Sequence, residues 1–332
     1  MTGKTIVYLP NWLGDMVMAT PFLKSLRQSF QGEIWAIGKT KSISLYNGMN
    51  LFNRFIPYDK RGVVSFFDIV SALKEIKFDL GLILPHSMRS ALLFYLGGVK
   101  ERIGYDRNKR GIMLTKKVKE DAFLKSTVEH YLKILDILSI KSQETTPVLV
   151  VTEDEENRYN EKFGYHKEAY VAFIPGAHYG PSKRWPVSNF VKLADLINEK
   201  MDFKIYILPG REEIRLLEEI KNHVKEKNNV EIRLLDVGEL KVCLSKATAV
   251  VSNDTGPRHI SAALSVPTFV IFGPMDERYT DYPSQCTYKF INNIPCRPCN
   301  KKDCDKKLEC LLGITPEEVY NKMEETIGRN RI

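Results

Sequence analysis

Residues 249–272 read AVVSNDTGPRHISAALSVPTFVIF, which is two short apolar runs separated by a helical stretch rich in small residues. The runs Ala249–Ser252 and Thr268–Phe272 are typical of strands that are buried on both faces, as in a parallel sheet. Parallel neighbours need a long crossover connection, and the stretch between the two runs supplies one. The segment therefore predicts a β–α–β unit and an α/β fold.

The same alternation runs along the rest of the chain. We expect further strands at Thr5–Leu9, Glu33–Ile37, Arg54–Pro57, Leu80–Leu84, Tyr170–Ile174, Lys204–Leu208 and Val230–Leu234. Helical patterns lie between or after them at Phe66–Ile76, Ala91–Leu96, Ser126–Leu138, Val187–Lys200, Arg211–Lys225 and Thr315–Ile327. Two such blocks predict two doubly wound, Rossmann-like domains.

The length of 332 residues suits two domains. The stretch Lys141–Glu156 is polar and follows a long helical pattern, so we place the boundary there, with domains at 1–150 and 151–314. Ligands of open α/β sheets bind at the carboxyl ends of the strands. Two facing sheets would place the functional site in the cleft between the domains.

Composition limits the class of protein. Hydrophobic residues make up 43% and charged residues 27%, which excludes a disordered or fibrous chain. The net charge of +8 suits nucleic acid, an anionic membrane surface, or a phosphorylated or acidic substrate. No signal-peptide pattern opens the sequence and no apolar run approaches the roughly 18 residues of a membrane span, so we expect a cytoplasmic protein.

The first loop whose residues could take part in catalysis or binding follows the first predicted strand. It contains Asn11, Gly14 and Asp15. Gly14 permits close approach of the backbone. Asp15 falls near the start of a helix, where an ionised carboxylate is favoured and could act as a general base. The alternative is that Asp15 only caps the helix.

The second loop, residues 173–190, reads FIPGAHYGPSKRWPVSNF and places Lys183 and Arg184 just before a helix. Cations and backbone donors at a helix N-terminus bind phosphate. The loop does not match a Walker A sequence, and no dinucleotide-binding G-x-G-x-x-G follows the first strand. The alternative is a surface loop with solvated charges.

The third loop follows the strand at Ala249–Ser252. Thr255 and Gly256 could present backbone N–H groups to a phosphate, and His259 lies one helical turn further on. The alternative is that Asp254 is a helix cap and His259 a structural residue. Two phosphate-suited loops in one domain favour the functional interpretation.

Taken together, these segments resemble glycosyltransferase family 9, the bacterial heptosyltransferases of lipopolysaccharide core synthesis. Residues 84–111 point toward the ADP-heptose–lipopolysaccharide heptosyltransferase II branch. The motifs that carry the resemblance are Gly14-Asp15, Thr20-Pro21, Leu26-Arg27, Pro175-Gly176-Ala177, Lys183-Arg184-Trp185-Pro186, Asp254-Thr255-Gly256 with His259, and Phe272-Gly273-Pro274.

The resemblance implies a GT-B fold, in which the C-terminal helix (315–332) packs back on the first domain. It implies that the first domain binds a glycolipid acceptor and the second a nucleotide sugar. The implied reaction transfers L-glycero-D-manno-heptose from ADP-heptose to the heptose/Kdo inner core of lipopolysaccharide, with inversion. It implies no required metal or cofactor.

The resemblance also assigns roles to residues. Asp15 corresponds to the catalytic base, while Lys183 stabilises the ADP leaving group. The residues expected to bind the donor are Gly14, His178, Lys183, Glu213 (with Glu212 as a competitor), Leu235 and Val237 near adenine, Asp254, Thr255, Gly256 and His259.

Basic residues of the first domain are candidates for binding an acceptor that carries carboxylates and phosphates. The expected acceptor-binding residues are Asn11, Arg89, Arg102 and Arg110. Lys116, Lys117 and Lys119 could contact anionic headgroups, so we expect a peripheral protein of the inner membrane. The alternative is a solvated basic face.

Other functions remain open at this point. A family 9 enzyme could use another sugar nucleotide or another surface glycan. A nucleic-acid-binding protein would explain the charge, but the basic residues are dispersed and no recognition motif appears, so we expect no nucleic acid partner. A non-catalytic sugar-nucleotide-binding module is disfavoured because both Asp15 and Lys183 are present.

Four of the six cysteines lie close together, at Cys296, Cys299, Cys304 and Cys310. Four thiolates can hold zinc tetrahedrally, although the spacing lacks the paired C-x2-C form. The alternatives are free thiols or disulfides formed on oxidation. A structural zinc site is therefore one prediction for this loop.

Overall fold

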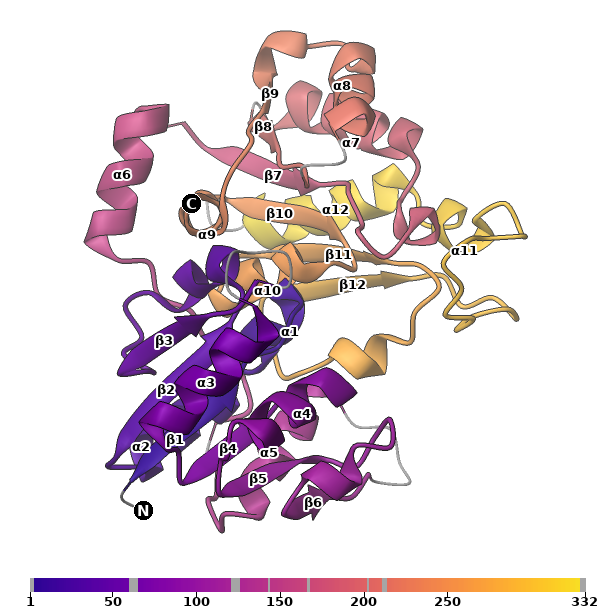
Figure 1. Cartoon of the computed structure of the whole chain (residues 1–332). Helices are drawn as coiled ribbons and strands as arrows, with labels where there is room; N and C mark the ends of the chain where they lie inside the picture. The colour runs from indigo at the N-terminus through magenta and orange to yellow at the C-terminus, as the bar shows by residue number, and fades with distance from the viewer. Residues whose placement is uncertain are drawn as a thin grey trace. The chain divides into compact units, whose positions relative to one another are not determined.

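A computed structural model describes residues 3–59, 65–120, 126–142, 144–165, 168–201, 203–210 and 214–328 (Figure 1). The chain divides into two compact units. The first unit contains Met1–Val150 together with the short segment Arg278–Pro283. The second contains Val151–Glu277 and Ser284–Ile332, so the main division falls inside the stretch in which we expected the boundary.

The first unit is built on one sheet whose strands all pair in parallel. Its strands are β1 (Lys4–Tyr8), β2 (Glu33–Gly38), β3 (Arg54–Pro57), β4 (Leu80–Ile83), β5 (Glu101–Tyr105) and β6 (Lys116–Val118). Their order is β3-β2-β1-β4-β5-β6. The chain reverses its direction of winding between β1 and β4, which is where such sheets bind ligands.

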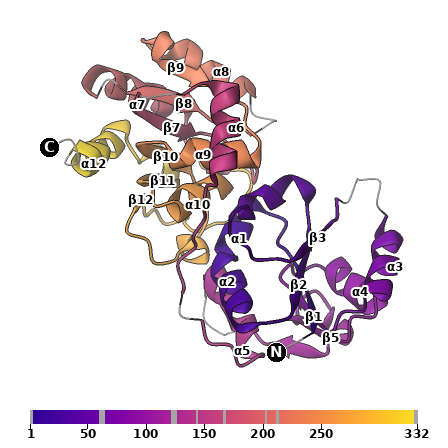
Figure 2. The same cartoon turned by 90° about the vertical axis from the view of Figure 1, so that its left-hand side faces the viewer.

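Helices cover both faces of this sheet (Figure 2). The helix pair α3 and α4 packs on one face, and α2 packs with α5 and α1 on the other. Their bounds are α1 (Leu13–Met18), α2 (Thr20–Ser29), α3 (Phe66–Ile76), α4 (Met88–Leu96) and α5 (Thr127–Asp136), with 3-10 turns η1 (Thr40–Tyr46) and η2 (Gly111–Met113). Pro21 is the second residue of α2, where a proline costs no hydrogen bond because it lies in the first helical turn.

The second unit repeats the arrangement. Its strands are β7 (Tyr170–Ile174), β8 (Lys204–Ile207), β9 (Val230–Ile232), β10 (Ala249–Asn253), β11 (Thr268–Phe272) and β12 (Thr287–Ile291). They pair in parallel in the order β12-β11-β10-β7-β8-β9, which is the order of the first sheet when strands are numbered within each unit. Its reversal point lies between β7 and β10.

Two groups of helices pack around the second sheet. Helix α7 contacts α8 and α12, whereas α9 contacts α6 and α10 (Figure 2). Their bounds are α6 (Glu153–Phe163), α7 (Val187–Lys200), α8 (Ile214–His223), α9 (Val237–Ser245), α10 (Gly256–Ala263), α11 (Glu309–Leu312) and α12 (Pro316–Ile327), with 3-10 turns η3 (Pro181–Lys183) and η4 (Lys227–Asn229). A further 3-10 turn, η5 (Glu277–Thr280), begins at the last residue before the segment Arg278–Pro283 of the first unit.

These sheets confirm the predicted α/β class with two doubly wound units. Strands such as β7 and β11 match the predicted bounds, because every residue in them is buried and apolar runs of that kind are easy to recognise. The strands β5, β6 and β12 were not predicted. They carry charged or half-exposed residues, and a pattern of that kind is indistinguishable from a loop.

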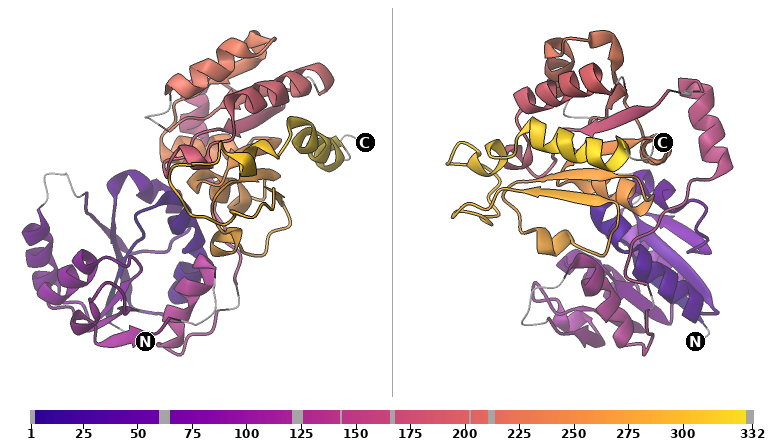
Figure 3. Two further views of the ribbon diagram at one scale, coloured as in Figure 1. Left: turned by 90° about the vertical axis from the view of Figure 1, so that its right-hand side faces the viewer. Right: turned by 180° about the vertical axis from the view of Figure 1, so that it is seen from behind.

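The C-terminal helix corrects one expectation. Val319, Tyr320 and Met323 of α12 are buried in the core of the second unit, where α12 packs on α7 (Figure 3). The indole Nε1 of Trp185 also donates to the carbonyl of Ile314, 3.0 Å away, just before the helix begins. The prediction that this helix packs back on the first unit is therefore wrong, because its apolar face is used within the second unit.

Candidate active site

Asp15 lies in the first turn of α1, directly beyond the carboxyl end of β1. The N-cap of this helix is Trp12, so Asp15 is not the cap residue that the structural alternative required. The side chain of Asp15 is half-buried. Burial raises its pKa to about 6, because the ionised form loses hydration.

Two buried tyrosines lie in the electrostatic range of Asp15. Burial raises the pKa of Tyr46 and of Tyr131, and the negative charge of Asp15 raises both further. The Tyr46 hydroxyl donates to the carbonyl of Met16, 2.9 Å away, within α1. Asp15 is thus a carboxylate whose proton can leave near neutral pH, close enough to two buried phenols to affect them while they stay protonated.

Asn11 and Arg89 are placed near the carboxyl ends of the first sheet's strands. The carbonyl of Asn11 accepts from Lys39 Nζ at 3.1 Å. The Nε of Arg89 donates to the Tyr58 hydroxyl at 2.7 Å, and its guanidinium lies 4.9 Å from the centre of the Phe66 ring. Arg89 is exposed, so its charge is presented to solvent.

The guanidinium groups of Arg102 and Arg110 donate hydrogen bonds to backbone carbonyls. Arg102 Nε donates to the carbonyl of Met113 at 2.6 Å. Arg110 is fully buried and donates to the carbonyls of Tyr105, at 2.8 Å, and Pro85. Arg110 exposes no surface, and these bonds order the loop after β4, while its Nη2 has no hydrogen-bond partner among the described residues. Acceptor binding by Arg110 stays a prediction.

In the second unit, the predicted phosphate loops meet at the reversal point of the sheet. Strands β7 and β10 are neighbours, and Ser252 pairs with Ile174 at their ends. Asn253 joins the two loops: its Oδ1 accepts from the backbone N–H of Trp185 at 3.0 Å, and its Nδ2 donates to the carbonyl of Pro175 at 2.7 Å. This buried amide holds the loop with Lys183 against the loop with Asp254.

Lys183, Asp254 and Arg258 form a compact cluster of ion pairs at this point of the second unit. Lys183 Nζ lies 2.7 Å from Asp254 Oδ2 and also donates to the Asp254 carbonyl at 3.1 Å. Arg258 Nε lies 3.0 Å from the other oxygen, Oδ1. Burial by itself would raise the pKa of Asp254, but the charges of Arg258 and Lys183 outweigh it and hold the pKa at about 2. The carboxylate is therefore ionised at physiological pH.

The N-terminus of α10 faces the same region. Its N-cap is Thr255, which makes no side-chain capping bond, and the Thr255 hydroxyl is buried with no hydrogen-bond partner among the described residues. Gly256 begins the helix, and the buried His259 follows with a pKa that burial lowers well below its usual range. An uncapped helix N-terminus near a lysine is an anion-binding arrangement.

The other predicted donor residues are less closely grouped. His178 is exposed in the loop after β7, and Leu235 is half-buried just before α9. Gly14 is buried in α1 and belongs to the first unit, whereas the loops predicted to bind the donor belong to the second unit. Glu212 and Glu213 lie outside the described residues.

Two site residues were not predicted from the sequence: Asn253 and Arg258. The signal for Arg258 was available, since it lies four residues after Asp254 and side chains at that spacing share one face of a helix. Asn253 ends a strand, and nothing in its local pattern indicates the contacts that its amide makes across the sheet.

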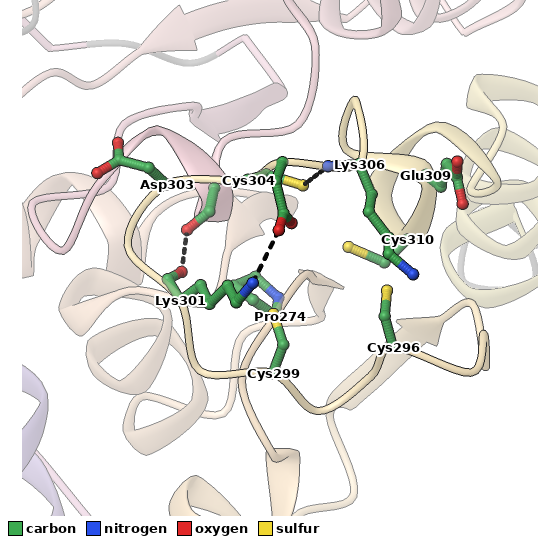
Figure 4. A pocket seen from close by; sticks show the side chains of 11 residues that line it. Pro274, Cys296, Cys299, Lys301, Asp303, Cys304, Lys306, Glu309 and Cys310 are labelled. Carbon is green, nitrogen blue, oxygen red and sulfur yellow. Dashed lines mark hydrogen bonds and ion pairs between the residues drawn. The ribbon is translucent and has the colours of Figure 1, made fainter.

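The four clustered cysteines line one pocket together with Ser182 and Pro274 (Figure 4). The sulfur of Cys304 accepts backbone N–H groups of Lys306 and Leu308, each at 3.4 Å. Within the described ranges, no group of three or more His, Cys, Asp or Glu side chains is placed to hold a metal ion. Structural zinc at Cys296, Cys299, Cys304 and Cys310 stays a prediction from their spacing.

The cysteine loop also touches the loop that carries Lys183. Ser182 Oγ donates to the carbonyl of Lys301 at 2.7 Å (Figure 4), and the Tyr179 hydroxyl donates to the carbonyl of Asn300 at 2.7 Å. The cysteine-rich segment therefore supports the backbone on both sides of Gly180.

Residues 66–309 match the family model described as glycosyltransferase family 9 (heptosyltransferase). This chain belongs to glycosyltransferase family 9. The match covers more than half of the chain and includes the Lys183 and Asp254 loops.

Relatives of this family 9 member match it over nearly its whole length. It is 28% identical over 330 residues to lipooligosaccharide heptosyltransferase 2 of Campylobacter jejuni serotype O:6, covering 97% of this chain and 98% of that one. It is 26% identical over 341 residues to lipopolysaccharide heptosyltransferase 2 of Escherichia coli K12, covering 96% and 97%.

The fold of the family 9 chain also matches a solved structure. The structure of Escherichia coli ADP-heptose lps heptosyltransferase II superposes with a TM-score of 0.86 at 23% identity, covering 99% of this chain and 100% of that one. The match confirms the two doubly wound domains of the predicted GT-B fold, and the family confirms a glycosyltransferase of the heptosyltransferase type. Among the residues that the structure describes, no helix is long and apolar enough to cross a bilayer.

Proposed function

We propose that this family 9 enzyme transfers heptose from ADP-heptose to the inner core of lipopolysaccharide, with inversion at the anomeric carbon. The observation that carries the proposal is the anion site at the reversal point of the second sheet. There Lys183, the uncapped N-terminus of α10 and the orphaned Thr255 hydroxyl occur together. The relatives named heptosyltransferase 2 support the choice of heptose.

The leaving group is the first requirement of the reaction. When the bond between the anomeric carbon and the diphosphate oxygen breaks, ADP keeps the electron pair and its negative charge grows. Lys183 and the backbone N–H groups that open α10 provide positive potential for that charge. Asn253 holds the backbone of the Lys183 loop through Trp185 and Pro175, and a site that is ordered in advance needs less reorganisation during the step.

The attacking hydroxyl is the second requirement. It must lose a proton as it bonds to the anomeric carbon from the side opposite ADP. Asp15 suits this role, because a pKa of about 6 leaves it mostly ionised at pH 7 yet basic enough to take a proton. One displacement of this kind inverts the configuration and forms no covalent enzyme intermediate.

The acceptor is assigned to the first unit. Arg89 keeps an exposed guanidinium beside Tyr58 and Phe66, so it can pair with carboxylates or phosphates of the inner core. Asn11 lies next to the helix that carries Asp15. Arg102 is half-exposed, and we assign it to the acceptor site partly because its hydrogen bond to the Met113 carbonyl orders the backbone there.

We place the same unit against the inner membrane. Ile112 in η2 is 85% exposed, and Phe67 in α3 is 72% exposed. Exposed apolar side chains with a neighbouring lysine, here Lys109, are typical of peripheral membrane contact. The apolar groups would enter the interfacial layer while the lysine pairs with anionic headgroups.

The proposal is tested by thermal shift with ADP, UDP, GDP and CMP, followed by turnover with ADP-heptose. ADP should raise the melting temperature of the wild type, because ligand that binds only the folded state stabilises it. Lys183→Ala should lose most of that shift, while Lys192→Ala, on the exterior of α7, should keep it. A larger shift with UDP or GDP would identify a family 9 enzyme for another sugar nucleotide.

A further inference from the structure

Trp12 is an exposed aromatic residue that lies just beyond the carboxyl end of β1. Its side chain is 58% exposed, whereas the other two tryptophans of the chain, Trp35 and Trp185, are 9% and 1% exposed. A single exposed apolar side chain carries no function by itself. The place of Trp12 in the first unit is what distinguishes it.

Trp12 occupies a position for which an indole is poorly suited. It is the N-cap of α1, and its side chain makes no capping hydrogen bond. Serine, threonine, aspartate and asparagine stabilise a helix start, because their short polar side chains accept backbone N–H groups. Local rules of this kind are broken mainly at functional sites. The presence of an indole here therefore points to a ligand outside the helix.

The helix fixes Trp12 to the residue that we propose as the base. Asp15 lies in the first turn of α1, three residues after Trp12. The backbone N–H of Met16 donates to the Trp12 carbonyl at 2.9 Å, and that of Ala19 donates to the Asp15 carbonyl at 2.9 Å. A ligand that rests on the indole is thus held beside the turn that carries Asp15.

Lys39 adds a cation to the same place. It directly follows β2, the strand that pairs with β1. Its Nζ donates to the Asn11 carbonyl at 3.1 Å and lies 5.9 Å from the centre of the Trp12 ring. The negative face of an aromatic ring attracts a cation at this distance, which limits the orientations of the indole. Lys39 is also exposed, so its charge can reach an anionic group of the same ligand.

We infer that Trp12 is the surface on which a sugar ring of the acceptor stacks. The inference rests on the proposed function. One face of a pyranose ring presents C–H groups, whose small positive partial charges are attracted to the negative face of an indole. The hydroxyl groups lie at the edge of the sugar ring, so one of them stays accessible to Asp15. Stacking fixes the plane of the ring and thereby determines which hydroxyl group approaches the base, while Lys39 pairs with a carboxylate or phosphate of the acceptor.

The first test is intrinsic fluorescence of the full chain with a lipid-free heptosyl-Kdo oligosaccharide as the probe. Because Trp35 and Trp185 are buried, quenching by acrylamide reports mainly on Trp12. The oligosaccharide, added above its KM, should remove most of this quenching. In Trp12→Phe the quenching itself should be largely lost. Unchanged quenching of the wild type above the KM would overturn the inference.

The second test is steady-state kinetics with the same oligosaccharide at saturating ADP-heptose. Trp12→Ala should raise the acceptor KM at least about tenfold, with a smaller effect on kcat. Trp12→Phe keeps an aromatic face and should stay within about threefold of wild type. The thermal shift caused by ADP should be the same in all three proteins, which also checks that each variant is folded.

Tyr165→Ala is the matched control. Tyr165 belongs to the second unit, is 71% exposed, and has Lys246 Nζ 5.8 Å from its ring centre. Its loss should leave the acceptor KM unchanged. An unchanged acceptor KM in Trp12→Ala would overturn the inference, and so would a loss seen only with a lipid-bearing acceptor, because Trp12 would then contact the membrane. If the wild type transfers no heptose, the proposed function itself falls.

Discussion

Two aspartates, each near the carboxyl end of a strand, show how environment divides their roles. Asp15 loses hydration, and burial raises its pKa to about 6. Asp254 is more deeply buried, yet Arg258 and Lys183 hold its pKa at about 2. Carboxyl groups whose pKa values are pushed apart in this way take different parts in a reaction. Asp15 can exchange a proton near neutral pH, whereas Asp254 remains a fixed negative charge.

The raised pKa of Asp15 predicts how activity depends on pH. The base must be ionised for catalysis. The value of kcat/KM for ADP-heptose should therefore fall about tenfold for each pH unit below pH 6 and become constant above pH 7. Asp15→Asn should lose at least about a hundredfold in kcat. ADP binding to this variant should stay near wild type. Retained turnover in Asp15→Asn would remove the residue from the role of base.

The same shift predicts an effect on stability with the opposite sign. The folded pKa of Asp15 lies above the value of an exposed aspartate, so the folded protein binds the proton more tightly than the unfolded chain. Its ionisation therefore lowers stability as pH rises from about 4 to 6. Asp15→Asn should be more stable than wild type at pH 7, by on the order of 2 kcal/mol, but not at pH 4. Urea unfolding at both pH values measures this difference, and an equal effect at both would contradict it.

At the scale of elements, helices α6 and α9 are joined by a buried ion pair. Lys241 Nζ lies 2.8 Å from Glu155 Oε2, and both side chains are almost fully buried. Glu155 also closes the capping box of α6 by accepting from the backbone N–H of Thr152. A glutamine at this position can keep the cap but not the charge.

Glu155→Gln should therefore destabilise the protein by about 3 kcal/mol, because the buried ammonium of Lys241 loses the carboxylate that lies 2.8 Å from it. Glu155→Gln/Lys241→Met should recover at least half of that loss. Lys162 and Glu239 connect the same two helices at the surface, so Lys162→Gln is the matched control and should cost less than about 1 kcal/mol. Equal losses for the buried and exposed pairs in urea unfolding would contradict the argument.

The elements also differ in how far the sequence predicts them. Helices α3 and α7 were predicted with the bounds that the structure has, since each shows a continuous apolar face. The edge strand β6 was not predicted, because only one of its residues is buried. The prediction of where α12 packs was also wrong. The amphipathic pattern of this segment predicts a helix, but it does not identify the surface that covers the apolar face.

At the scale of the whole molecule, the net charge of +8 suits the ligands that we propose. The proposed ligands are a nucleoside diphosphate sugar and an anionic glycolipid, both of which attract a basic protein. Ion pairs such as Lys117 with Asp106 and Lys116 with Glu101 neutralise part of the basic surface of the first unit. The remaining attraction to a membrane should therefore depend on exposed apolar groups as well as on charge.

Cosedimentation with vesicles tests the membrane contact. The wild type should bind vesicles containing anionic lipid at low salt and lose most of that binding at high salt. Ile112→Ser should weaken binding roughly tenfold, because one exposed isoleucine no longer enters the interface. Leu312→Ser removes an exposed apolar side chain from the second unit, 51% exposed against 85% for Ile112, and serves as control. Equal effects of both substitutions would contradict the assignment of the membrane face to the first unit.

The sequence alone determined the α/β class, the two units, the loops that carry Asp15, Lys183 and Asp254, and the family to which they point. Local patterns are sufficient for this, because buried parallel strands and helix starts depend on residues that are close together in the sequence. Only the tertiary structure decided that Arg258 shares the carboxylate of Asp254, that Arg110 is buried, and that α12 packs on α7. These depend on which distant side chains meet and on how much water they lose, and neither is encoded in a short stretch of chain.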